Sequence, residues 1–248
     1  MFTQNRNNIQ LSLDSKPLFH VHTYRCGHAE KIPDEGYVLR ALELGATDLW
    51  FSDHAPFPGD PFRSRMLYAQ LDEYVASLQA LREKYEGRLR IHIGLEAEYL
   101  PTFDDCEYYN KLKIDHGIEF LLLGQHFAEV AASQYSFTMD KEWRTNFEHE
   151  VLGEAIVQGI RSGFFDFVAH PDRIFICHKV WDSATTRVAK SIIQTAAVYQ
   201  IPLEQNEASK RRKWAYWEEF WDLAFADSDI RTIHGLDAHS IKKLKIVP

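Results

Sequence analysis

The feature that most constrains the fold of this chain is an alternation of short apolar runs with stretches of helical periodicity. Seven apolar runs have the length of strands, at residues 18–22, 48–54, 90–96, 120–126, 165–170, 201–206 and 230–239. The stretches with helical features between them are residues 33–44, 70–85, 105–116, 148–161, 182–199 and 214–225. Strands that alternate with helices form parallel sheets. This number of units, with no linker or break in composition, predicts a closed or nearly closed α/β barrel formed by residues 1–248 as a single domain.

Histidine and carboxylate residues stand at the ends of these apolar runs or just after them. Nine such residues occur: His20, His22, His28, His54, Glu96, His126, His170, Asp237 and His239. The carboxyl ends of parallel barrel strands meet at one rim, where active sites form, so the topology predicts that these side chains converge. On strand parity, His20 and His22 leave the same face of the first strand.

This set of side chains has the composition of a metal centre. Imidazole and carboxylate together suit zinc, manganese and iron, and nine ligands are too many for one tetrahedral site. The pattern therefore predicts two or three divalent ions that share a bridging carboxylate. Such ions bind phosphoryl oxygens and generate hydroxide near neutral pH.

Each motif also has a purely structural interpretation. A His-x-His pair on a strand can be two packed histidines, and Asp53 or Asp237 can cap a helix or a turn. Burial of so many polar groups without ligands would be costly, so the joint pattern favours metal binding. The other five histidines are expected to be packed (His92, His234), exposed on the surface (His116, His149) or distant from the rim (His178).

Composition limits the classes of partner. The formal net charge of −8 repels nucleic acid and anionic membranes, which predicts no nucleic-acid partner. A small phosphorylated substrate stays compatible, because bound metal ions invert the local charge. The three cysteines, Cys26, Cys106 and Cys177, contain no Cys-x-x-Cys pair, which argues against a disulfide framework or a zinc knuckle. The polar N-terminus and the absence of a membrane-length apolar run predict a cytoplasmic protein, and the sequence leaves its oligomeric state open.

The ordered motifs resemble a known family, the polymerase and histidinol phosphatase (PHP) superfamily, and most closely its histidinol-phosphate phosphatase branch. They are HVH at 20–22, CGHA at 26–29, SDHAP at 52–56, GLEAEY at 94–99, LGQH at 123–126, AHPD at 169–172 and LDAHS at 236–240. The resemblance implies a distorted (β/α)7 barrel with a trinuclear metal centre. One departure is the segment Gly124–Gln125–His126, which is one residue shorter than the Gly-Ser-x-His pattern of the family.

The resemblance also implies which residues share an ion. His20, His22, Glu96 and Asp237 would hold the first ion. Glu96 would bridge to a second ion held by His126 and His170, and His28, His54 and His239 would hold the third. Glu96, His126, His170 and Asp237 are therefore the expected catalytic residues. Glu98 has the same strand parity as Glu96 and is expected to line the site or to accept a hydrogen bond from a ligand.

The expected reaction is hydrolysis of a phosphate monoester, in which a metal-bridging hydroxide attacks phosphorus in line. Arginine suits recognition of the phosphate dianion. The candidates after strand ends are Arg65, Arg173, Arg211 and Arg212, with Asn206 opening the basic segment 206–213. Arg63 and Arg65 have an alternative role in stabilising their own loop.

L-histidinol phosphate is implied as the substrate by the resemblance alone. The alternatives are a nucleotide or other small phosphoester, a binuclear amidohydrolase and a catalytically decayed metal-binding module. The amidohydrolase is disfavoured because no strand-end lysine is evident, and the decayed module because the ligand set is intact. The polar stretch 127–146 is expected to be a loop, with a substrate lid as one hypothesis for its role.

Overall fold

Seven strands form one sheet in the computed structural model, which describes residues 15–104, 107–131, 134–138, 148–212 and 215–247. Their order across the sheet is β1-β2-β3-β4-β7-β8-β9, the order in which they occur in the chain. Their bounds are β1 Pro17–Val21, β2 Asp48–His54, β3 Arg90–Ala97, β4 Phe120–Leu123, β7 Phe167–Val168, β8 Leu203–Asn206 and β9 Thr232–Gly235. The pairs β1–β2, β2–β3, β4–β7 and β7–β8 are parallel.

The backbone that follows β9 returns to the first strand of the sheet. The N–H of Leu236 donates to the carbonyl of Phe19 at 2.9 Å, and Val21 and Ala238 form a parallel bridge. The last strand of the sheet is thus linked to the first. The predicted α/β barrel of alternating strands and helices is confirmed.

Helices connect the strands, and their bounds are α1 Asp34–Glu43, α2 Leu71–Lys84, α3 Pro101–Asp104, α4 Tyr108–Ile114, α5 Glu148–Ser162, α6 Ser183–Tyr199, α7 Glu207–Arg211 and α8 Glu218–Phe225. Helices α1, α2, α5 and α6 begin and end within a residue of the predicted stretches, α4 and α8 are shorter than predicted, and α3 and α7 were not predicted. Four short 3-10 turns are described as well: η1 Tyr24–Cys26, η2 Tyr68–Gln70, η3 Pro171–Phe175 and η4 Ile241–Lys243. None of the helices in the described part of the chain is long and apolar enough to cross a membrane.

The chain divides into two compact units, and each is described separately below. The first unit comprises residues 1–96, 110–121 and 235–248, and the second comprises residues 97–109 and 122–234. The expectation of a single domain stays a prediction.

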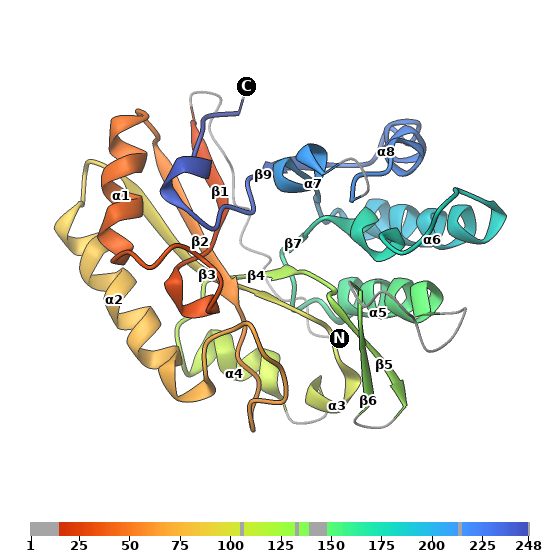
Figure 1. Ribbon diagram of the computed structural model, residues 1–248, viewed down its shortest axis with the longest axis horizontal. Coiled ribbons are helices and arrows are strands. Elements are labelled where there is room, and N and C mark those ends of the chain that lie inside the picture. The colour runs from red at the N-terminus through yellow and green to blue at the C-terminus, as the bar shows by residue number, and fades with distance from the viewer. Residues whose placement is uncertain (1–14, 105–106, 132–133, 139–147, 213–214, 248) are drawn as a thin grey trace. The chain divides into compact units, whose positions relative to one another are not determined.

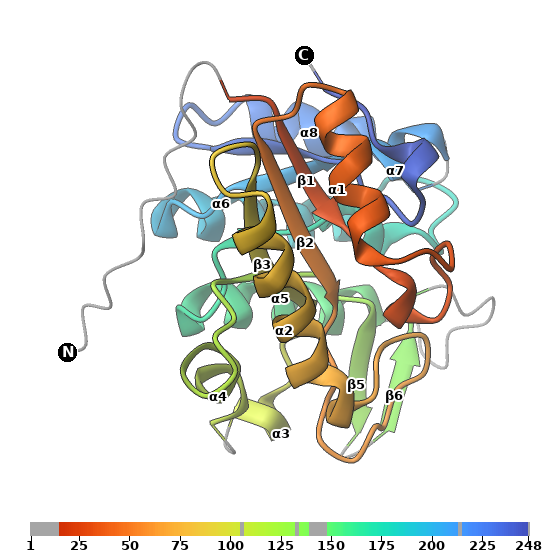
Figure 2. The same ribbon diagram turned by 90° about the vertical axis from the view of Figure 1, so that its left-hand side faces the viewer.

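In the first unit, α1 and α2 lie across β1, β2 and β3 (Figure 2). The sheet face is packed with aromatic side chains: Trp50 contacts Phe19 and Phe120 edge to face, with ring centroids 5.7 and 5.1 Å away.

The two ends of α1 carry residues that favour a helix. Asp34 and Glu35 occupy the first turn of α1, where negative charge complements the helix dipole. Gly45 follows the helix with φ +68°, a left-handed conformation that glycine adopts without strain. These features explain why a helix forms at the residues where the sequence predicts one.

In the second unit, α5 and α6 pack side by side (Figure 1). Gly153 permits the close approach, because a Cβ atom there would lie 2.3 Å from Cγ1 of Val188. Asp182 caps α6, and its carboxylate accepts the backbone N–H groups of Ala184 and Thr185. Good capping and a small residue at the contact together fix this helix pair.

The structure corrects the expectation of a loop at residues 127–146. Phe127–Ala131 (β5) and Gln134–Phe137 (β6) form an antiparallel hairpin in which Phe127 lies opposite Phe137. Their ring centroids are 5.0 Å apart, and cross-strand aromatic pairs of this kind stabilise a hairpin.

Residues 132–133 and 139–146 of the expected loop lie outside the described residues. The lid hypothesis stays a prediction.

Candidate metal centre

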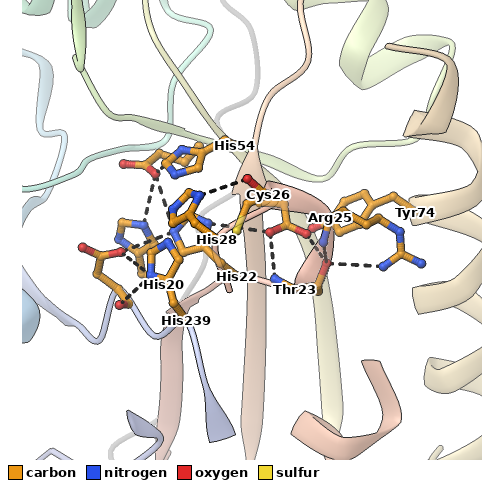
Figure 3. Close-up of polar contacts among 12 residues, drawn as sticks. His20, His22, Thr23, Arg25, Cys26, His28, His54, Tyr74 and His239 are labelled. Carbon is orange, nitrogen blue, oxygen red and sulfur yellow. Dashed lines mark hydrogen bonds and ion pairs between the residues drawn. The ribbon is translucent and has the colours of Figure 1, made fainter. Parts of the chain in front are cut away.

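The first unit gathers several of the predicted ligands around the carboxylate of Glu96, near the end of β3. Figure 3 shows five of the histidines side by side: His20, His22, His28, His54 and His239. An Oε atom of Glu96 lies 3.0 Å from Nδ1 of His54, 3.4 Å from Nε2 of His20 and 3.6 Å from Nε2 of His22. All four side chains are buried. The pairing of β2 with β3 explains part of the arrangement, because His54 and Glu96 are register partners at the ends of the two strands.

His20 reaches Glu96 by a backbone irregularity rather than by regular strand alternation. The pairing of β1 with β2 shifts register between Leu18 and Val21, and His20 has φ +66°. Strand parity predicted that the side chains of His20 and His22 lie close together, and their ring centroids are indeed 4.9 Å apart. The reason given was wrong, because His22 lies just past the end of β1 and His20 lies within the irregular step.

The segment after β9 brings two further predicted ligands to the cluster. Oδ1 of Asp237 lies 3.5 Å from Nε2 of His22 and 3.3 Å from Nδ1 of His239. The His239 ring stacks on His22 with centroids 4.2 Å apart and lies 4.5 Å from His28. Asp237, like His20, has a left-handed backbone, with φ +47°. Six histidines and carboxylates from the ends of four strands (β1, β2, β3 and β9), together with His28 from the loop after β1, therefore form one cluster.

Three acidic side chains, those of Asp237, Asp53 and Glu96, act on the charge of His22 in this cluster. Burial acts to lower the pKa of His22, but the carboxylates of Asp237 and Asp53 raise it to about 9. For His239, burial and the neighbouring His22 lower the pKa to about 3. Asp237 is held ionised, because the nearby histidines outweigh its burial and depress its pKa. The cluster thus places negative charge where a positive ion is needed.

The residues present fit divalent metal ions. Ligand atoms lie within 4.8 Å of one another in the groups His28–His54–His239, His20–His22–Asp237 and His22–His54–Glu96. Two of these groups consist of residues expected to share an ion. Both ring nitrogens of His22 and Nε2 of His239 are buried without a hydrogen-bond partner among the described residues. Buried polar atoms of this kind are costly unless they bind a ligand. The assignment of individual residues to individual ions stays a prediction.

The second unit contains the other two predicted histidine ligands. The rings of His126 and His170 lie 5.1 Å apart, and both side chains are buried. Nδ1 of His126 is 3.2 Å from Oε1 of Glu98, which confirms the expectation that Glu98 bonds a predicted ligand. The N–H of His170 donates to the carboxylate of Glu204 at 3.0 Å. A carboxylate at a ring nitrogen, as Glu98 is for His126, orients the ring of a metal-binding histidine, whereas the Glu204 carboxylate holds only the backbone of His170.

Sequence reasoning missed the role of Asp53 and treated it only as a potential helix cap. Its buried carboxylate accepts the Thr23 N–H at 2.7 Å and bonds the Thr23 hydroxyl as well. Its Oδ1 also lies 3.7 Å from Nδ1 of His22. Asp53 therefore secures the turn that follows the two histidines of β1. Its position beside His54 at the end of an apolar strand was the available signal.

The candidate phosphate-binding residues lie in different surroundings. Arg65 donates from Nη1 to the carbonyl of Ala55 at 2.8 Å and stacks over Phe57 and Phe62, which supports its alternative role in loop stabilisation. Asn206 caps α7 by accepting the Ser209 N–H at 2.8 Å and donates to Glu204. Arg173 lies in η3, Arg211 ends α7, and Arg212 follows it; both Arg211 and Arg212 are exposed. Substrate binding by Arg65, Arg173, Asn206 or Arg211 stays a prediction.

The histidines set aside on sequence grounds show one clear error. His92 packs as expected, since it stacks on Trp50 at 3.8 Å and bonds Asp48. The expected exposure of His149 is wrong: it is 4 % exposed, because α5 turns it inward, where its ring meets His178 at 4.4 Å.

Comparison with known proteins agrees with the fold and the motifs. The profile of the PHP domain family matches residues 19–208. A probable histidinol-phosphatase of Deinococcus radiodurans is 29% identical over 243 residues, which cover 89% of this chain and 85% of that protein. A histidinol-phosphatase of Bacillus subtilis is 34% identical over 92 residues, about a third of either chain.

Two solved structures share the fold across most of their length. A putative histidinol phosphatase of Listeria monocytogenes superposes with a TM-score of 0.73 at 18% identity, covering 92% of this chain and 97% of that one. A histidinol phosphate phosphatase of Lactococcus lactis, solved with zinc, L-histidinol and phosphate, superposes with a TM-score of 0.69 at 20% identity, covering 92% and 87%. Because the family profile spans most of its residues, this chain belongs to the PHP domain family.

Proposed function

We propose that this chain is a histidinol-phosphatase, a metal-dependent phosphomonoesterase that hydrolyses L-histidinol phosphate to L-histidinol and phosphate. The observation that carries the proposal is the buried cluster around Glu96, in which His20, His22 and His54 lie within 3.6 Å of one carboxylate. The name comes from relatives in the same family, one of which matches 89% of this chain. The small phosphorylated substrate is therefore the proposed partner.

The proposed cofactors are two or three divalent ions, chosen from zinc, manganese and iron. Zinc stands first because a structural relative of this family was solved with it and because the donors are mainly imidazoles. Three residue sets would hold the ions of a trinuclear centre: His20, His22, Glu96 and Asp237; His126 and His170 with Glu96; and His28, His54 and His239. Bound ions of this kind activate water for attack on phosphorus and neutralise charge on the phosphoryl oxygens.

The protein's own residues hold this chemistry in place. Glu96 gathers three imidazoles from two strands, and Asp53 fixes the turn that carries His22. These side chains are almost entirely excluded from solvent, so their electrostatic interactions with a bound divalent ion would be stronger than in water. Recognition of the phosphate is proposed for Arg173 and Arg211, since Arg65 is already bonded to its own loop. A cytoplasmic location is part of the same proposal.

The test is release of phosphate from L-histidinol phosphate, beside a panel of nucleotides and sugar phosphates, with zinc or manganese and after chelation. We expect chelator-sensitive release from histidinol phosphate that is lost in His22→Ala. His116→Ala is the matched control, because His116 bonds Asp72 away from the cluster and its loss should leave turnover unchanged.

Each other outcome points to a different function. Release from another member of the panel alone would keep the metal chemistry and replace the substrate. No release from any member, with metals confirmed bound, would instead favour the non-catalytic metal-binding module.

A further inference from the structure

A cysteine lies within the histidine cluster, although the ligand sets above do not include it. The sulfur of Cys26 and ring nitrogens of His22 and His239 all lie within 4.8 Å of one another. Cys26 is fully buried, and Figure 3 shows it beside His28, with Thr23 and Arg25 of the same turn on its other side. The thiol therefore occupies a position from which it can reach an ion bound to these imidazoles.

The backbone around Cys26 fixes its direction. Cys26 is the last residue of η1, whose N-cap is Thr23. Gly27 follows with φ +80°, and its N–H donates to the carbonyl of Tyr24 at 3.0 Å, which closes the turn. Nδ1 of His28 lies 2.9 Å from the carbonyl of Cys26. One short turn thus positions both Cys26 and His28 against the cluster.

His22 independently indicates that a ligand belongs at this place. Its side chain is fully buried, and neither of its ring nitrogens has a hydrogen-bond partner among the described residues. Nε2 of His239 is in the same situation. The carboxylates of Asp237, Glu96 and Asp53 approach the His22 nitrogens only to 3.5–3.7 Å. Buried imidazole nitrogens without a hydrogen-bond partner normally bind something, and an ion close to both rings would also be close to the sulfur of Cys26.

A buried cysteine often acts only as a small apolar residue. Two imidazoles, those of His22 and His239, have ring nitrogens near its sulfur, and imidazole and thiolate are ligands that zinc combines in one shell. Thiolate is a soft ligand, which suits zinc, whereas manganese prefers oxygen donors. The surroundings of Cys26 are therefore those of a ligand rather than those of an aliphatic core.

We propose that Cys26 is a sulfur ligand to a divalent ion held against His22 and His239, and that it biases the centre toward zinc over manganese. Binding breaks the S–H bond of Cys26, forms a sulfur–metal bond and releases the proton to solvent. The inference depends on the metal centre of the proposed function but not on its substrate.

The test uses the full chain with Cys26 as its sole cysteine, in the variant Cys106→Ser/Cys177→Ser. Cys177 is exposed, so its loss should not disturb the cluster. X-ray absorption of the zinc-loaded variant should contain a sulfur neighbour at about 2.3 Å besides nitrogen and oxygen at about 2.0–2.1 Å. Cobalt loading should give a thiolate-to-cobalt charge-transfer band in the near ultraviolet. Adding Cys26→Ser to the same background should remove both signals.

A competition between zinc and manganese provides a second measurement. Outer-shell partners of metal ligands are worth roughly 10–100-fold in affinity, so loss of a direct ligand should lower zinc affinity by about tenfold or more. Loss of Cys26 should lower manganese affinity less than zinc affinity. The control variant Cys177→Ser should leave both affinities unchanged.

Zinc bound with only nitrogen and oxygen neighbours would overturn the proposal, and so would a charge-transfer band that survives Cys26→Ser. The absorption measurement on the variant that keeps Cys26 as its sole cysteine decides the matter even if the Cys26→Ser variant does not fold. All these readouts are taken without substrate. A chain that binds zinc through sulfur but does not hydrolyse histidinol phosphate would refute only the proposed function. An active enzyme without a sulfur ligand would refute only this inference.

Discussion

Replacing Gly94 with alanine should destabilise the first unit, because the strand that carries Glu96 passes directly over an aromatic ring. A Cβ atom at Gly94 would lie 2.3, 2.4 and 2.5 Å from three ring carbons of Phe120. The ring would have to retreat by about 1 Å to reach ordinary van der Waals separation. It has little room to do so, because Phe120 is 1 % exposed and packs against Trp50 and Phe19.

Forcing extra atoms into a packed core costs about 1–3 kcal/mol. For a chain of this size, each kcal/mol corresponds to a fall in Tm of about 2–4 °C. Thermal unfolding followed by circular dichroism measures the change. In the background Gly94→Ala, the further change Phe120→Leu should recover part of the loss, because the smaller side chain frees the space that the new methyl group needs.

Gly36→Ala is the matched control for this experiment. Gly36 lies inside α1, and its added Cβ would meet only the flexible end of Ile32, at 3.0 Å. Alanine is favoured over glycine inside a helix by roughly 0.5–1 kcal/mol, so the stability of Gly36→Ala should stay level or rise. If Gly94→Ala were as stable as Gly36→Ala, the packing of β3 on Phe120 described here would be wrong.

Three further predictions concern the cluster and the barrel wall. Asp53→Asn should weaken zinc binding in a metal titration by about 10–100-fold, because it removes the carboxylate 3.7 Å from His22; undiminished affinity would contradict its positioning role. Burial acts to raise the pKa of Asp48, but hydrogen bonds from Arg90 and other neighbours outweigh it and lower the pKa in the folded protein. The ionised Asp48 therefore stabilises the fold above the unfolded-state pKa of about 3.8, and this stabilisation is lost as the pH falls through the lower folded-state pKa. The Tm of Asp48→Asn should accordingly fall less steeply than that of wild type as the pH is lowered. Parallel plots of Tm against pH would refute the stabilising role of the ionised Asp48. His20→Gly should be more stable than His20→Ala by about 1 kcal/mol, because glycine relieves the left-handed backbone; at His22, which is not left-handed, the order should reverse.

Much of the fold follows from local patterns that the sequence displays directly. The strand 48–54 was predicted with its correct residues, and the helix that begins at Ser183 was predicted within one residue, because burial on both faces and helical periodicity leave strong local signals. The pairing of His54 with Glu96 follows from the same information, since equivalent positions at the ends of adjacent parallel strands lie side by side. Topology alone was therefore enough to bring these two ligands together.

Other features depend on contacts that one sequence does not display. The strands β5 and β6 have only five and four residues, and it is their antiparallel pairing and the packing of Phe127 on Phe137 that distinguish the hairpin from a loop. The burial of His149 depends on the neighbouring segment that contains His178, which lies far from it in the sequence. In both cases a tertiary contact overrides a weak local preference.

The backbone of the predicted ligands carries information that strand parity does not. His20, His170 and Asp237 are three of the seven non-glycine residues with positive φ in the described chain, and all three were predicted ligands. Such conformations cost about 1–3 kcal/mol each and persist where the surrounding structure enforces them. Histidines that served only to fill the core would pack equally well from an extended backbone, without this cost. The strained backbone instead directs the His20 side chain toward Glu96 and the Asp237 side chain toward His22, around the place where an ion would bind. It therefore favours metal binding over the packing interpretation, on grounds independent of the spacing of histidines in the sequence.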